Sequence, residues 1–104
     1  MSRLEQLQKF LEQDPKDSFT RYAIGLEYAS AKNFAEAIRG FEELRGSDAS
    51  YVPTYYQLAD CYRQIGDKAK AAEIYKTGIE RARSANDLHA ASELQTALEE
   101  LDDE

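Results

Sequence analysis

The chain has 104 residues, of which 42% are hydrophobic and 32% are charged. With only two prolines and five glycines, this composition fits one small globular domain and excludes fibrous and low-complexity chains. No apolar run approaches the roughly 20 residues that cross a bilayer, and the first residues lack the apolar core of a signal peptide. We therefore expect a cytoplasmic protein that has no membrane segment.

The net charge is −7, from 13 basic and 20 acidic residues. Five acids lie in the last six residues, so residues 1–98 carry only −2 of that charge. Because an acidic chain repels a phosphate backbone, we expect no nucleic-acid partner. The acidic tail, residues 102–104, is expected to be solvated and to fray. A role in binding a basic partner or divalent ions is the alternative.

The sequence repeats itself with a period of 34 residues. Across this shift small residues stay small and aromatic residues stay aromatic. The aligned pairs are Tyr22 and Tyr56, Ile24 and Leu58, Gly25 and Ala59, Tyr28 and Tyr62, Ala37 and Ala71, and Phe41 and Tyr75. A fixed period of this length is typical of proteins built from stacked helical units.

The first expected helix covers residues 2–13. Its apolar residues lie one period before those of a later helix, so it corresponds to the second helix of a truncated unit. The pairs are Leu4 and Ile38, Leu7 and Phe41, and Phe10 and Leu44. Asp17 or Ser18 would cap the helix that follows.

Two full units follow, residues 18–51 and 52–85, and each predicts a pair of antiparallel helices. Apolar residues three and four apart share one helix face, as Tyr55, Leu58 and Tyr62 do. The breaks fall at Lys32-Asn33 and Gly66-Asp67, where Gly suits a left-handed helix end and Asn or Asp can cap the next helix. The expected helices cover residues 17–31, 34–46, 52–65 and 68–84.

The last expected helix covers residues 87–101. The register of the repeat fails here, because Leu58 would align with Ser92. One face is still apolar and the other is polar, which is typical of the capping helix that ends a stacked array. The apolar stripe consists of Leu88, Ala91, Leu94, Leu98 and Leu101. The whole pattern predicts an all-α fold, an antiparallel helix-hairpin solenoid of about six helices, within a single domain over residues 1–101.

The repeated motifs resemble the tetratricopeptide repeat, whose pattern is Trp-x-x-Leu-Gly-x-x-Tyr, then Ala-x-x-x-Phe, then Pro. The first unit reads Arg21-x-x-Ile24-Gly25-x-x-Tyr28, then Ala37-x-x-x-Phe41; the second reads Tyr55-x-x-Leu58-Ala59-x-x-Tyr62, then Ala71-x-x-x-Tyr75. The Trp position holds Arg21 and Tyr55, and the closing Pro position holds Ala49 and Arg83. Asp14-Pro15 matches the closing turn of a preceding unit. The resemblance covers residues 18–85 closely.

The sequence carries no recognisable catalytic or metal-binding pattern. The single cysteine, Cys61, and the single histidine, His89, exclude an internal disulfide, a cysteine-based zinc site and a multi-histidine metal cage. The two could in principle form a nucleophile and its base. A lone cysteine beside Ala59 and Tyr62 is, however, typical of a small buried residue, and His89 is expected on the surface. We expect no enzyme, no cofactor and no metal.

The resemblance implies a concave groove lined by the first helix of each unit, in which a peptide or helix of a partner protein binds. In this sequence the side of those helices opposite the buried stripe carries the candidate residues. They are Phe19, Tyr22, Leu26, Ser30, Tyr56, Gln57, Asp60, Arg63 and Gln64. Aromatic residues are favoured at interfaces, so the groove should prefer an apolar or aromatic segment, with Asp60 and Arg63 adding polar contacts. Some members of the family grip a terminal carboxylate with Lys and Asn, but Tyr22, Leu26 and Gln57 stand at those places here.

Two other interpretations of this aromatic surface remain open. Phe19 and Tyr22 could pack against Phe10 or Leu11 of the first helix and belong to the core. The same surface could also be the interface of a homodimer, because two full units fall short of the roughly three that a stable array needs.

Overall fold

A computed structural model describes residues 1–104, and it contains six α-helices and no strand. The helices are α1 (Arg3–Gln13), α2 (Ser18–Ser30), α3 (Phe34–Ser47), α4 (Pro53–Gln64), α5 (Lys68–Ser84) and α6 (Leu88–Asp102). Both ends of every helix lie within one residue of the expected position, so the all-α prediction is confirmed. The division into repeats at residues 18–51 and 52–85 stays a prediction.

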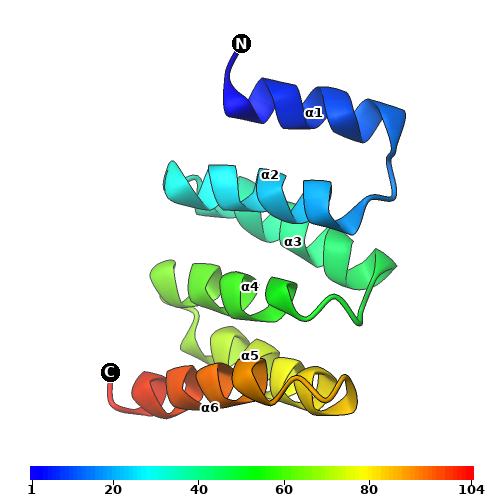
Figure 1. Ribbon diagram of the computed structural model, residues 1–104. Helices are drawn as coiled ribbons and strands as arrows, with labels where there is room; N and C mark the ends of the chain where they lie inside the picture. Colours follow the sequence, from blue (N-terminus) through cyan, green and yellow to red (C-terminus); the bar gives the residue numbers. More distant parts are fainter.

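The helices stack in chain order, and consecutive helices run in opposite directions (Figure 1). Helices α2, α4 and α6 form one layer, and α3 and α5 lie behind them. The most extensive contacts join α2 to α3, α4 to α5, and α5 to α6, while α2 also touches α4. Helix α1 makes its main contacts with α2. The side chains on the open side of α2, α4 and α6 therefore share one surface.

The ends of the helices follow from local chemistry at the breaks in the pattern. The Asp17 and Asp67 side chains accept hydrogen bonds from backbone N–H groups in the first turns of α2 and α5, which satisfies donors that a helix start leaves free. Gly66 has φ 87° and Lys32 has φ 62°, so a left-handed residue ends the first helix of each unit. Asn33, in contrast, forms no capping hydrogen bond through its side chain.

The core is one continuous cluster of 16 buried residues, reaching from α3 to α6. Its largest side chains are the rings of Phe41, Tyr55 and Tyr75, all of which are fully buried. Each of two rings lies directly over a glycine of the neighbouring helix. A Cβ atom on Gly78 would lie 2.6 Å from Cβ of Tyr55, and one on Gly25 would overlap the Phe41 ring. The close approach of paired helices thus requires a glycine beneath each of these rings.

A partly buried polar contact joins α3 to α4. The Tyr62 hydroxyl donates a hydrogen bond to Oε2 of Glu42 at 2.5 Å, and Arg45 pairs with the other oxygen of Glu42 at 2.8 Å. Burial and the bond to Glu42 raise the pKa of Tyr62 above its usual value. The Glu42 carboxylate is therefore half-buried within this contact.

Two glycine substitutions distinguish the effect of close packing on stability from the effect of helix propensity. Gly78→Ala should lower the free energy of unfolding by about 2 kcal/mol, because the new methyl group meets the buried Tyr55 side chain. Gly40→Ala should raise it by about 1 kcal/mol, because no atom lies within 4 Å of a Cβ placed there. Denaturant unfolding followed by circular dichroism measures both. A stabilising Gly78→Ala would contradict the packing described above.

The Tyr62 contact predicts a difference between two tyrosines one period apart. Tyr62→Phe should lower the free energy of unfolding by about 1.5 kcal/mol, because it removes a hydrogen bond to a charged group. Tyr28→Phe is the matched control, since no hydrogen bond of the Tyr28 hydroxyl is present and its removal should change little. The same unfolding measurement compares them, and equal losses would show that the bond to Glu42 contributes nothing specific.

Candidate partner-binding groove

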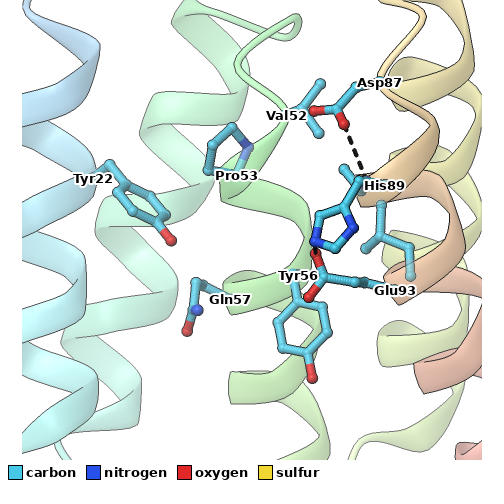
Figure 2. A pocket seen from close by; sticks show the side chains of 10 residues that line it. Tyr22, Val52, Pro53, Tyr56, Gln57, Asp87, His89 and Glu93 are labelled. Carbon is cyan, nitrogen blue, oxygen red and sulfur yellow. Dashed lines mark hydrogen bonds and ion pairs between the residues drawn. The ribbon is translucent and has the colours of Figure 1, made fainter.

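Three adjoining cavities follow the open side of α2, α4 and α6. The central cavity, of about 430 Å³, lies among all three helices (Figure 2). Tyr22 comes from α2, the middle of the cavity is built by the start of α4, and α6 forms the far side. Its lining consists of Tyr22, Val52, Pro53, Tyr56, Gln57, Asp87, His89, Ala90, Glu93 and Leu94.

A second cavity of about 510 Å³ lies between α2 and α4, and a third of about 280 Å³ lies between α4 and α6. The α2–α4 cavity shares Gln57 with the central cavity. The α4–α6 cavity shares Tyr56, His89 and Glu93 with it. The three together form one surface across the layer, which we call the groove.

The structure brings most of the predicted binding residues into this groove. Seven of the nine line at least one cavity: Tyr22, Leu26, Ser30, Tyr56, Gln57, Asp60 and Gln64. Phe19 and Arg63 line none of the three. Phe19, in the first turn of α2, is 64% exposed. Arg63 forms ion pairs with Asp60 and Glu104.

Tyr22 is partly a core residue. Its ring lies 5.9 Å from the Phe41 ring and 5.8 Å from the Tyr51 ring, measured between centroids. Burial raises the pKa of Tyr22 above its usual value. The interpretation that α1 covers both aromatic residues of α2 is wrong for Phe19, because Phe19 is exposed and Phe10 is itself 61% exposed.

Tyr56 is the aromatic side chain that the groove presents most openly. It is 41% exposed, and its ring meets the buried Tyr75 ring edge-on with 6.1 Å between centroids. Burial raises the pKa of Tyr75 to about 12, so that hydroxyl stays neutral. One part of the Tyr56 ring thus packs against the core, and the rest is available to a ligand.

Helix α6 contributes residues that the sequence prediction missed. His89, Ala90 and Glu93 line the central cavity, although α6 was expected to act only as a cap. The 34-residue step could not have placed them, because the register of the repeat fails in this helix and Leu58 aligns with the exposed Ser92. Leu88 was expected in the buried stripe of α6, and this is wrong because its side chain is exposed.

Arg63 forms ion pairs, one of them with Glu104 of the acidic tail. Arg63 pairs with Asp60 at 2.7 Å and with Glu104 at 2.8 Å, and these bonds, first to Asp60, raise the pKa of Arg63. Lys68 Nζ also donates a hydrogen bond to the backbone oxygen of Glu104 at 2.6 Å. Residues 102–104 are exposed, and Glu104 contacts α4 and α5 through these surface bonds. Fraying of the tail stays a prediction.

The two residues considered for catalysis lie in opposite environments. Cys61 is buried in the core, and burial raises the pKa of its thiol to about 11. The His89 side chain is 87% exposed, and Glu93 lies 3.1 Å from its Nε2 atom. No group of three side chains is arranged to hold a metal ion. None of the helices combines the length and the apolar character needed to cross a membrane.

Comparison with known proteins connects this arrangement to one family. The sequence model of the tetratricopeptide repeat family matches residues 28–98. A tetratricopeptide repeat domain protein from Salinibacter ruber, solved by NMR, is 40% identical, with 85% of this chain and 89% of that chain covered and a TM-score of 0.80.

Two further proteins are similar at lower identity. The TPR2B domain of yeast Sti1, in its complex with pHsp70, has a TM-score of 0.90 at 17% identity over 96% of this chain and 80% of that chain. At this identity the likeness shows the fold alone. Anaphase-promoting complex subunit 3 from Dictyostelium discoideum is 23% identical over 77 residues. That match covers 74% of this chain and only 8% of the curated relative.

The environment of Cys61 predicts slow thiol chemistry in the native protein. A rise of the pKa from 9.0 to about 11 lowers the thiolate fraction about 100-fold at a pH near 8. Iodoacetamide should therefore modify the native protein at least 100 times more slowly than the protein unfolded in guanidinium chloride. Mass spectrometry of timed samples measures both rates, and equal rates would mean that Cys61 is accessible and reactive.

Proposed function

The chain belongs to the tetratricopeptide repeat family, and we propose that it is a protein-interaction module that binds an extended or helical segment of a partner protein in the groove. The observation that carries this proposal is the continuity of the groove across α2, α4 and α6. A surface that runs over three helices can contact several consecutive side chains of a bound segment. We propose a binding role without catalysis.

The lining of the groove favours a segment with an apolar or aromatic side chain. Val52, Pro53 and Tyr56 form an apolar wall in the middle of the central cavity, and Leu26 lies in the adjoining cavity. Ser30 and Gln64 add polar groups at the edge. Binding pockets commonly combine apolar walls with a few polar groups that orient the ligand. The yeast Sti1 domain forms a complex with pHsp70, which supports a peptide-binding use of the shared fold.

A homodimer is the alternative function, and exposed aromatic rings favour it. Phe19 and Tyr56 of the same aromatic surface remain open to solvent in the single chain, and a second copy would remove them from water. Light scattering over a dilution series measures the mass directly. A constant monomer mass rules out the dimer, and a mass that doubles with concentration, but not in Phe19→Ala or Tyr56→Ala, assigns the dimer interface to these rings. The cytoplasmic location expected from the sequence stays a prediction.

The groove predicts how binding depends on Tyr56. Peptides selected from a phage-displayed random library on the wild-type protein should bind Tyr56→Ala at least tenfold more weakly, as expected when an interface aromatic is truncated. Tyr56 is the better test than Tyr22, because Tyr22 packs against Phe41 and its loss would also cost stability. Fluorescence anisotropy with the labelled peptides measures the affinities.

Phe10→Ala is the matched control for this experiment. Phe10 is an exposed aromatic side chain on α1 that lines no part of the groove, so its truncation should leave binding unchanged. Circular dichroism confirms that both variants stay helical. Peptides that bind Tyr56→Ala as well as wild type, or that lose affinity for Phe10→Ala instead, would place the binding surface outside the groove.

A further inference from the structure

The charge of the groove differs between its two sides. The central and α4–α6 cavities are lined by three acidic residues, Asp87, Glu93 and Glu100, and by no lysine or arginine. The α2–α4 cavity also holds acids, but cations accompany them. Glu27 lies 3.5 Å from Arg3, and Asp60 pairs with Arg63 at 2.7 Å. The side of the groove formed by α6 therefore carries the uncompensated negative charge.

The carboxylates of α6 are available to a ligand. Glu100 forms no ion pair with any residue of the chain, and the only pairing partner of Glu93 is the exposed His89. Asp87 caps α6 by accepting a hydrogen bond from the Ala90 backbone through one oxygen, so its second oxygen stays free. Figure 2 shows Asp87, His89 and Glu93 along the α6 side of the central cavity, with Tyr56 of α4 close by.

The spacing of these groups fits a side-chain cation. Glu93 and Glu100 are seven residues apart, so they lie on one face of α6 at a separation of about 10 Å along the helix. Tyr56 belongs to both cavities that these carboxylates line. A lysine or arginine of a bound segment would meet a carboxylate and the face of an aromatic ring at the same place, which is favourable through both charge and cation–π attraction.

We propose that the partner segment is basic, with lysine or arginine side chains placed between Glu93, Glu100 and Tyr56 and an apolar side chain seated against Val52 and Pro53. This inference rests on the proposed function and adds the chemistry of the partner. The occupant is a segment of another protein, selected by charge complementarity with the α6 side of the groove. Nucleic acids are disfavoured by the same carboxylates.

The test uses the same phage-displayed peptide library and a charge-neutralised pair of variants. Peptides selected on the wild-type protein should be enriched in lysine and arginine next to an apolar residue. Glu93→Gln combined with Glu100→Gln should weaken their binding about fivefold, the size expected for two exposed ion pairs. The loss should shrink as salt is added, because salt screens exposed charges.

Glu12→Gln combined with Glu80→Gln is the matched control. Both residues are exposed and neither lines the groove, so this variant has the same net charge and should bind like wild type. Thermal unfolding checks that both double variants are folded. Equal weakening by the two variants would reduce the effect to net charge and overturn the proposal.

The failure of this proposal is distinguishable from the failure of the proposed function. Selected peptides that lack cations but still depend on Tyr56 would overturn the basic-segment proposal and leave the interaction module standing. Peptides that bind independently of Tyr56, or a library that yields no binder, would overturn both. Cationic peptides whose affinity falls in the Glu93 and Glu100 variant alone would support both.

Discussion

The close approach of paired helices over glycine is the constraint on which the rest of the structure depends. Gly25 lies beneath the Phe41 ring and Gly78 lies beneath the Tyr55 ring. Because no methyl group separates these helices, the rings fill the space between successive helices and leave no room for a larger residue. This packing fixes α2 against α3 and α4 against α5. The sides of α2 and α4 that face away from these contacts line the groove, so the shape of the groove depends on the packing behind it.

Helix α6 belongs to the same stack but differs in composition from the helices before it. It packs against α5 as closely as α4 does, and it buries Ala91, Leu94 and Leu101. The other side of α6 carries exposed polar residues, among them Ser92, Glu93 and Glu100. The polar surface extends into the groove, where Glu93 and Glu100 lie opposite Tyr56. Helix α6 therefore supplies one wall of the groove.

The fold was predictable from the sequence because its determinants are local and repeated. Helix periodicity, caps at Asp17 and Asp67 and the conserved spacing of small and aromatic residues between the two units all indicate the same hairpin. The groove was predictable only where it used those repeated helices. The part formed by α6 was missed because its apolar residues leave the register of the repeat. The place of Phe19 and of Glu104 depends on contacts between distant segments, which no periodicity encodes.

The two ends of the groove differ in charge, so a bound segment would not be equally stable in both orientations. Near α2 the acids are compensated by Arg3 and Arg63, so the attraction there is mainly apolar, through Leu26. Near α6 the carboxylates are open and the attraction is electrostatic. Under the proposed function, a bound segment gains most when its apolar side chain lies against Val52 and Pro53 and its cation lies toward the carboxylates of α6. A cation placed toward α2 instead would meet acids that are already paired with Arg3 and Arg63. We therefore infer that electrostatics would select the orientation of such a partner, while the apolar wall of the central cavity would select its apolar anchor.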